Sequence, residues 1–235
     1  MIKALSFKLR GDYGHFKKYY TTTSPLTFEF PPPPTVVGIV SAIIGLDKSC
    51  YLSEFPEDSF KLAVCITKPV KKARWTVNLI DTKKHFWHIQ NRTQIRTEYL
   101  KDPEYEIFFH HSDSVLYNQL KSNLENHRTV YSVSLGLSEL LGDFSYTGEH
   151  HLEEVKSQDF QSIRSVVPVS RLLDDRSVRF DDNREIFKVS YPVIMAPDRV
   201  VVRRDDVIFE RCARSVTSKV DAFHVTEKGE NIVFF

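Results

Sequence analysis

This chain of 235 residues lacks the features that mark several large classes of protein. Its three cysteines are odd in number and include no CxxC pair, so neither a disulfide framework nor a cysteine zinc site is indicated. The longest apolar run, residues 36–46, is interrupted by Gly38, Ser41 and Gly45 and is too short to span a bilayer. The first residues also lack the hydrophobic core and cleavage site of a secretory signal. We therefore expect a cytoplasmic protein, with no membrane partner, whose cysteines are small core residues.

Several enzyme signatures are missing too. The sequence contains no GxGxxG turn, no GxxxxGK[ST] loop, no GxSxG elbow and no HExxH pair. Its nine histidines include adjacent pairs at 110–111 and 150–151, and neighbours in a strand point to opposite faces rather than to one ion. We predict no bound metal and no cofactor, and we expect neither a nucleotide-using nor a hydrolytic enzyme.

What the chain does have is an ordinary soluble composition with an uneven charge distribution. Hydrophobic residues make up 41% and charged residues 27%, which excludes disordered and fibrous proteins. Residues 1–100 hold 15 Lys and Arg against 8 Asp and Glu, whereas the remainder holds 17 against 23. The first half is thus expected to carry a basic surface, and the second half either to face a basic partner or to repel nucleic acid from the wrong side.

Residues 10–45 form the most distinctive segment, because four of the eight glycines lie there beside a run of four prolines. Within it, Lys17 and Lys18 precede Tyr19 and Tyr20. Cations next to flat rings suit a single-stranded nucleic acid, whose phosphates pair with the lysines while its bases stack on the tyrosines. The same four residues also fit a solvated loop that folds its rings onto a nearby core.

The periodicity predicts an α+β chain of alternating strands and helices. The first strand is expected at residues 2–9, and extended prolines 31–34 then lead to a buried helix over residues 36–46, capped by Thr35. Further strands are expected at 61–67, 75–80, 97–100, 105–110 and 131–137, with a second helix at 112–126 capped by Ser112 or Asp113. A cationic and aromatic tract at 83–96 is expected to project as a hairpin or loop. This βαββαβ series is that of a ferredoxin-like domain over residues 1–145, followed by a small β-rich domain over 146–235.

Four stretches carry a resemblance to a known family. RGDYGHFKKYY, FEFPPPPTVVGIVSAIIGL, QIRTEYLKDPEYEIFF and LGLSEL follow one another in the order seen in the Cas-five family of CRISPR-associated proteins, and the chain most resembles the type I-B variety. The resemblance implies a repeat-associated RNA-binding fold, a ferredoxin-like domain with a thumb hairpin inserted between its second and third strands. It implies a subunit that caps the 5′ handle of a CRISPR RNA (crRNA) in the Cascade surveillance complex, without cutting it, in antiviral defence. The implied partners are crRNA, the Cas-seven backbone subunit, a Cas-eight-type large subunit and, through the complex, target DNA.

The resemblance also assigns residues to the RNA. Its handle-binding loop corresponds to Arg10, Gly11, His15, Phe16, Lys17 and Lys18, and Gly38 would let RNA backbone approach the first helix. The thumb would span residues 78–94, with contacts from Lys83, Lys84, His85, Trp87 and Arg92 and with Arg96 and Tyr99 at its base.

Type I-C relatives leave an enzymatic alternative open, because in them this fold cuts precursor RNA without metal, using a tyrosine, a lysine and a histidine. The candidate parts in this chain are Tyr19, Tyr20, Lys83, Lys84, His85 and His88. Such a group would deprotonate the 2′-hydroxyl and stabilise the pentavalent phosphate. Since that group does not map in register onto this chain, we expect RNA binding rather than cleavage.

Overall fold

The computed structural model describes residues 1–80, residue 87 and residues 92–235. Within these ranges the longer strands are β1 (Ile2–Arg10), β3 (Phe60–Ile66), β4 (Lys72–Ile80), β5 (Arg92–Lys101), β6 (Glu104–His111), β7 (Asp143–Val155), β10 (Ile186–Met195) and β11 (Val201–Glu210). The shorter strands are β2 (Tyr13–Gly14), β8 (Gln161–Ile163), β9 (Val167–Pro168), β12 (Val216–Ser218), β13 (Phe223–Val225) and β14 (Asn231–Ile232). The helices are α1 (Pro33–Ile44) and α2 (Ser114–Glu125), with short 3-10 turns η1 (Tyr51–Glu54), η2 (Glu57–Ser59) and η3 (Val169–Arg171). The α+β class is therefore confirmed.

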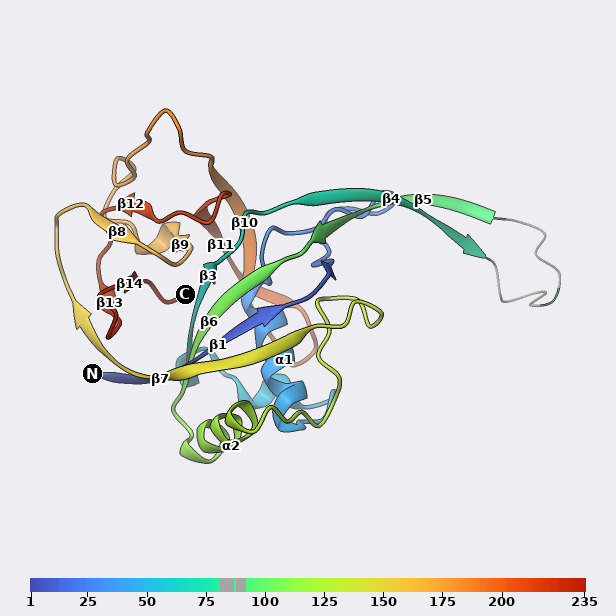
Figure 1. The fold of residues 1–235 in the computed structure, drawn as a ribbon, viewed down its shortest axis with the longest axis horizontal. Coiled ribbons are helices and arrows are strands. Elements are labelled where there is room, and N and C mark those ends of the chain that lie inside the picture. The colour runs from blue at the N-terminus through green and yellow to red at the C-terminus, as the bar shows by residue number, and fades with distance from the viewer. Residues whose placement is uncertain (81–86, 88–91) are drawn as a thin grey trace.

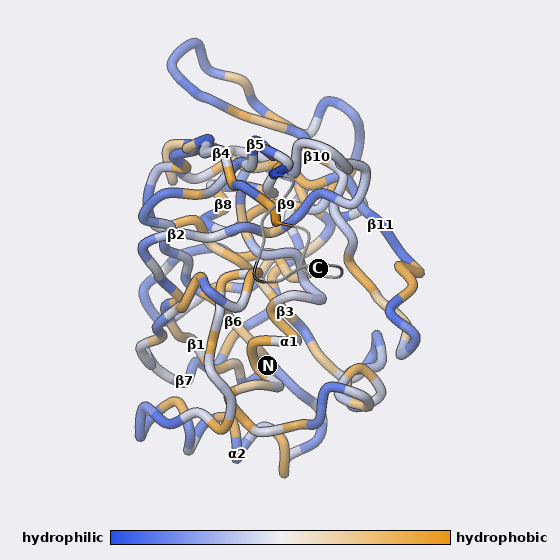
Figure 2. The backbone as a smooth tube through the Cα atoms, turned by 90° about the vertical axis from the view of Figure 1, so that its right-hand side faces the viewer, coloured by the Kyte–Doolittle hydropathy of each residue, from blue (hydrophilic) through white to orange (hydrophobic). Residues whose placement is uncertain are grey.

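The centre of the molecule is an antiparallel sheet in the order β7-β1-β6-β3 (Figure 1). The chain passes through α1 between β1 and β3, and through α2 between β6 and β7. Alternate β1 residues Leu5, Phe7 and Leu9 are buried with the apolar residues of both helices, so α1 and α2 cover the same face of the sheet. Hydrophobic stretches accordingly run through β1, β6 and α1, while the outer loops are largely hydrophilic (Figure 2).

Helix α1 starts earlier than the sequence pattern predicts. Pro32 is its N-cap residue, and Pro33 and Pro34 already stand in the first turn. Proline is tolerated there because the first amides of a helix have no intrahelical acceptor. The expectation that all four prolines are extended and that Thr35 caps the helix is therefore wrong. The helix ends at Gly45, whose φ of 86° is the left-handed conformation that glycine adopts at low cost.

Helix α2 agrees with the prediction, whereas the strand expected at residues 131–137 is absent. Asp113 caps α2, since its Oδ1 accepts a hydrogen bond of 2.7 Å from the amide of Val115. Val133 and Leu135 are buried, which gives their segment a strand-like alternation. Residues 131–137 instead form a loop that packs on residues 11–16, and the carbonyl oxygen of Leu135 accepts a hydrogen bond from the amide of His15. The fourth strand of the central sheet is β7, which begins at Asp143.

Strands β4 and β5 form an antiparallel hairpin that extends away from the rest of the molecule (Figure 1). The hairpin begins earlier than position 78, at Lys72, and much of the tract expected to project, residues 83–96, lies outside the described residues. Short strand β2 pairs with β5 at the hairpin base, where Tyr13 faces Lys101. The strand predicted at residues 97–100 thus lies within the longer β5.

The C-terminal part continues the central sheet and adds a second one. Strand β7 runs through residue 145, pairs with β1 and then with β13, so the eight-stranded sheet includes both halves of the chain. Strands β10, β11 and β9 form a separate three-stranded sheet. Tyr191 of β10 stacks on Phe30 with ring centroids 4.2 Å apart, which ties this sheet to the segment before α1.

The burial of the cysteines and the character of the helices also bear on the sequence predictions. Cys65 is buried as expected, but Cys50 is exposed and Cys212 is half-buried, so only one of the three cysteines is a core residue. Within the ranges given above, no helix has the length and apolar character needed to cross a bilayer.

Candidate nucleic-acid interface

The loop at residues 10–20 divides into a buried and an exposed part. His15, Phe16 and Lys18 are 3%, 3% and 8% exposed. The Nδ1 atom of His15 lies 2.7 Å from the carbonyl oxygen of Glu98, while Phe16 belongs to the main core. The Lys18 ammonium pairs at 3.4 Å with Glu29. These three side chains therefore hold the loop to the body rather than offering it to a ligand.

Gly11 and Arg10 also have protein partners. A Cβ atom added at Gly11 would lie 2.7 Å from Cδ1 of Leu135, so this glycine makes room for the loop that follows α2. Arg10 forms an exposed ion pair of 3.1 Å with Asp143 at the start of β7. Exposed pairs of this kind contribute little stability, so the Arg10 guanidinium stays available to a phosphate.

Lys17, Tyr19 and Tyr20 form the exposed part of the loop. The two tyrosines are 50% and 57% exposed, and their rings meet edge to face with centroids 5.2 Å apart. Arg204 of β11 places its guanidinium carbon 4.6 Å from the Tyr19 ring centroid. The sequence pattern found the rings, while only the fold brings the β11 cation to them.

The β4–β5 hairpin has two chemically different faces. Because directly opposite residues of an antiparallel pair share a face, the pairs Arg74 with Glu98 and Thr76 with Arg96 define one of them. This polar face carries Lys72, Arg74, Thr76, Asn78, Arg92, Gln94, Arg96 and Glu98, with exposed Ile80 and buried Leu100 as its apolar members. The other face carries Trp75, Val77, Leu79, Ile95 and Tyr99. On the polar face, Arg92 and Arg96 are exposed and form no ion pair with any residue that the structure describes.

At the hairpin base the cations are held by two acids, buried Glu98 and half-buried Glu29. Glu98 accepts ion pairs from Lys72 at 3.0 Å and from Arg74 at 3.1 Å, and Glu29 accepts another from Lys72 at 2.8 Å. Burial by itself would raise the pKa of the Glu98 carboxyl, but the bonds from Lys72 and Arg74 outweigh it and hold this pKa below its usual value. The ionised Glu98 carboxylate, together with the Glu29 side chain, thus orients the basic side chains along the polar face.

The polar face ends in a cavity of about 450 Å³. Its lining combines the hairpin residues Lys72, Arg74 and Glu98 with Glu29, Val70, Phe187, Phe209 and Arg211. Phe187 is 44% exposed and stacks on the buried ring of Phe209 at 5.9 Å. An exposed ring beside fixed cations is the arrangement on which an unpaired base stacks while its phosphate is neutralised.

A second groove, of about 370 Å³, runs along α1 and contains Gly38. A Cβ atom at Gly38 would have only the Tyr51 hydroxyl within contact range, at 3.9 Å, so the helix backbone is open to the groove at this point. The opposite wall includes Ser134 and Gly136 of the loop after α2, together with Arg199. The structure therefore brings the predicted Gly38 together with the LGLSEL motif.

Of the residues predicted between positions 83 and 88, the structure describes only Trp87. Lys83, Lys84, His85 and His88 lie outside the described residues, so the thumb contacts and the catalytic alternative through these histidines stay predictions. Trp87 is described and 87% exposed. Among the residues with coordinates here, no group of three histidine, cysteine or carboxylate side chains is arranged to hold a metal ion.

Sequence reasoning missed several residues of these surfaces. Lys72 and Arg74 follow Lys71 in a short run of cations, which is a usable local signal. In contrast, Phe187, Arg199, Arg204 and Arg211 come from β10, β11 and their flanking turns, more than 80 positions from the hairpin. No local pattern marks them, because their proximity depends on how the second sheet packs on the first.

The comparisons with known proteins identify a CRISPR-associated family. Residues 4–215 match the model of a family described as CRISPR-associated protein (Cas_Cas5). No match was found among curated proteins.

Three solved structures share the fold at low sequence identity. A crystal structure of a CRISPR protein from Archaeoglobus fulgidus is 13% identical over 98% of each chain, with a TM-score of 0.56. A chain of a type III-B Cmr-beta complex bound to cognate target RNA and AMPPnP is 10% identical over 91% of this chain and 86% of its own, with a TM-score of 0.55. A chain of a CRISPR RNA-guided surveillance complex is 10% identical over 91% of each chain, with a TM-score of 0.50.

Proposed function

This chain belongs to the CRISPR-associated Cas_Cas5 family, and from that premise we propose that it is the RNA-binding subunit that caps the 5′ handle of crRNA in a CRISPR effector complex. The observation that carries the proposal is the polar face of the β4–β5 hairpin. Arg92 and Arg96, which form no ion pair among the described residues, lie on this face with Lys72 and Arg74. The exposed ring of Phe187 lies beside Lys72 and Arg74 in the cavity at the end of the face. Phosphates bind along such a row of cations, and an unstacked base binds at its aromatic end.

The topology supports the expected ferredoxin-like domain. Counting only β1, β3, β6 and β7, the strand order in the sheet is fourth, first, third, second, with both helices on one face. The β4–β5 hairpin stands between the second and third of these strands, where the thumb of the resembled family is expected. We accordingly assign the hairpin, residues 72–101, as the thumb of a ferredoxin-like domain.

We propose the binding partners of the chain on the same basis. Two of the similar folds come from assemblies described as an RNA-guided surveillance complex and a Cmr complex bound to target RNA. We propose a type I-B Cascade complex in which this subunit meets a Cas-seven backbone subunit and a Cas-eight-type large subunit, with target DNA bound by the whole assembly. The apolar face of the hairpin, with Trp75 and Leu79 exposed, suits contact with such a protein neighbour.

The proposal is tested with RNA of the repeat found beside the gene for this protein. Replacing Arg92 and Arg96 together by alanine should weaken binding at least tenfold. It should also lower the slope of log affinity against log salt by about 1.4, because each lost phosphate contact on a single strand removes about 0.7. Binding is measured by fluorescence anisotropy over a series of KCl concentrations.

The matched control replaces Arg128 and Arg176, two exposed arginines without ion pairs in the described part of the chain. This pair should leave both affinity and slope unchanged. If the hairpin pair and the control pair behave alike, RNA does not bind along the polar face.

The same RNA, labelled at its 5′ end and incubated in EDTA, separates capping from cleavage. Intact RNA on a denaturing gel agrees with the capping role. A single cut at the handle boundary would instead make the chain a metal-independent ribonuclease, with Tyr19, Tyr20, His85 and His88 as the residues to replace.

A further inference from the structure

A larger cavity, of about 490 Å³, shares no lining residue with the interface described above. It opens beside the end of β3, between the central sheet and the segments around η2, η3 and β11. Its lining includes Phe60 and Lys61 of β3, Lys156 after β7, Arg171 of η3, His224 of β13 and the aromatic residues Phe234 and Phe235. A volume of this size falls within the range of sites for small organic ligands.

His224 is the buried polar group of this cavity. It is only 2% exposed, and neither of its ring nitrogens has a hydrogen-bond partner among the described residues. The closest carboxylate oxygen, that of Glu154, is 3.8 Å from Nε2. Burial, and after it the positive charge of Lys61, lowers the pKa of His224 to about 4. At neutral pH the ring therefore presents one N–H donor and one acceptor that the protein itself does not use.

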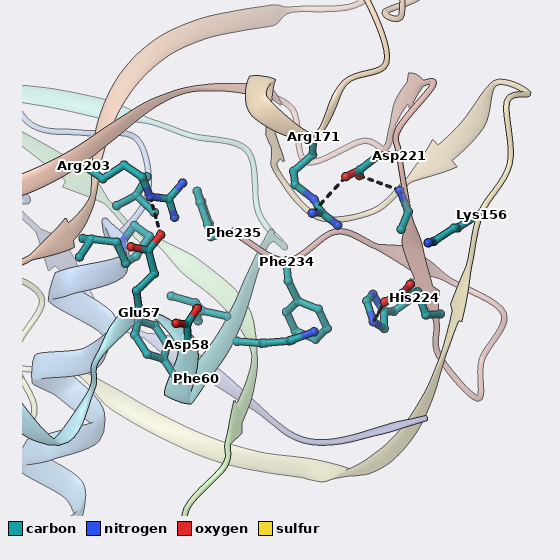
Figure 3. Close-up of a pocket in the computed structure, with 17 residues that line it drawn as sticks. Glu57, Asp58, Phe60, Lys156, Arg171, Arg203, Asp221, His224, Phe234 and Phe235 are labelled. Atoms are coloured by element: carbon teal, nitrogen blue, oxygen red, sulfur yellow. Dashed lines mark hydrogen bonds and ion pairs between the residues drawn. The ribbon is translucent and has the colours of Figure 1, made fainter.

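The charged groups of the cavity divide between its two sides (Figure 3). Arg171, Asp221, Lys156 and His224 lie on one side, Glu57, Asp58 and Arg203 lie on the other, and Phe234 stands between them.

Two ion pairs neutralise part of this charge. Arg203 pairs with Glu57 at 2.9 Å and Arg171 with Asp221 at 3.1 Å. In the part of the chain that the structure describes, Lys61 and Lys156 form no ion pair, and Asp58, on the opposite side, forms none either. With His224 neutral, the described residues of the cavity thus include two cations without an ion pair, Lys61 and Lys156, and two carboxylates without one, Asp58 and Glu154, beside aromatic surface.

We propose that this cavity binds a single nucleotide, at a site separate from the polar face of the hairpin. Lys61 and Lys156 neutralise the phosphate, and neutral His224 exchanges hydrogen bonds with a ribose hydroxyl. Phe234 and the partly exposed rings of Phe60 and Phe235 contact the base. Asp58 accepts hydrogen bonds from the N–H groups of the base, which favours bases with an exocyclic amine. The bound unit is either a free nucleotide or one nucleotide of a longer RNA.

Isothermal titration of the full chain with GMP, AMP, CMP, UMP and inorganic phosphate tests the site. The three nucleotides that carry an amino group should bind, UMP and phosphate should bind at least fivefold more weakly, and Asp58→Asn should reduce that preference. Replacing Lys61 and Lys156 by alanine should weaken nucleotide binding at least tenfold. Lys228→Ala, which removes an exposed lysine outside the lining, should change nothing.

A direct readout comes from the histidine ring. In a ¹H–¹³C NMR spectrum, the Cε1 resonance of His224, assigned with His224→Gln, should move when GMP is added to the unmodified protein. The site is overturned if no nucleotide binds at millimolar concentration, if phosphate binds as tightly as GMP, or if the lysine variants retain full affinity.

Competition with repeat RNA identifies the source of the nucleotide. If RNA displaces GMP, and the Lys61 and Lys156 variants also weaken RNA binding, the cavity holds a nucleotide of the bound RNA. If RNA and GMP bind together, the cavity holds a free nucleotide. Arg92 and Arg96 do not line this cavity, so replacing them should leave GMP binding unchanged. If these variants lose RNA binding but retain GMP binding, the nucleotide site and the capping site are tested independently.

Discussion

At the scale of single residues, Glu98 shows how burial and charge set the geometry of the interface. Its side chain is 6% exposed and accepts from both Lys72 and Arg74. A buried carboxylate needs such partners, because desolvation without them would neutralise it. The acid therefore holds the side chains of Lys72 and Arg74 in one orientation, whereas without it they would move freely in solvent.

Replacing Glu98 by glutamine should destabilise the protein by about 1.5–3 kcal/mol at pH 7, the range for hydrogen bonds to charged groups. The folded state lowers the pKa of Glu98 beneath 4.5, so its stabilisation is complete above that pH and is lost as the pH falls through the lowered value. Urea unfolding at pH 7 and pH 3 should therefore show a difference between variant and parent that shrinks in acid.

Glu153→Gln is the control for this effect, since Glu153 is exposed and has no ion pair within the described ranges. It should alter stability by less than about 0.5 kcal/mol. A Glu98 variant as stable as this control at pH 7 would show that the two ion pairs contribute nothing measurable.

At the scale of elements, two glycines that face the same groove have opposite structural roles. Gly136 lies in the loop after α2 with a φ of 103°, and a Cβ atom there would be 1.9 Å from the carbonyl oxygen of His15. Gly38 lies within α1 and has room for a Cβ atom. The first glycine is required by the packing of one loop on another, whereas the second is not required by the fold.

Substitution by alanine should separate these roles. Gly136→Ala should destabilise the chain by at least about 1–3 kcal/mol because of its backbone conformation, with the contact to His15 adding to this. Gly38→Ala should stabilise it by up to about 1 kcal/mol, since alanine favours a helix interior over glycine. Thermal unfolding measures both, and a loss of stability in Gly38→Ala would contradict the open space seen beside α1.

The Gly38→Ala variant also tests whether RNA binds beside α1. If the RNA backbone approaches α1 as proposed, the added methyl group should weaken repeat RNA binding even though the protein is more stable. Unchanged affinity would place the RNA away from this part of the groove.

At the scale of the whole molecule, the two halves of the chain share one sheet. The boundary expected at 145/146 lies inside β7, whose pairing with β1 runs from Asp143 to Leu152 across that boundary and which then pairs with β13 at residues 153–155. Tyr191 of β10 also donates a hydrogen bond of 3.1 Å to Glu29, next to the N-terminal core. Strands that share hydrogen bonds and a core are expected to unfold together.

Differential scanning calorimetry should therefore show one transition for the full chain, with a calorimetric enthalpy equal to the van't Hoff enthalpy. Two resolved transitions, or a calorimetric enthalpy well above the van't Hoff value, would instead support independent domains at 1–145 and 146–235.

The sequence by itself determined the elements whose signals are local. Strand alternation predicted β1, β3 and β6, and an apolar run and a capping aspartate predicted α1 and α2, because side-chain periodicity and helix capping act over a few residues. The ordered motifs predicted the family as well. The same local logic failed at residues 131–137, where an alternation of buried residues came from loop packing without a partner strand.

Only the tertiary structure decided which functional residues meet. Lys17, Lys18, Tyr19 and Tyr20 form one motif in the sequence, yet Lys18 is buried against Glu29 while its neighbours are exposed. Arg204 and Phe187 reach the interface from a second sheet, and His224 meets Lys61 from positions more than 160 residues apart. Such proximity depends on how strands distant in the chain pack together, and burial then decides whether a charged or aromatic side chain supports the fold or remains free for a ligand.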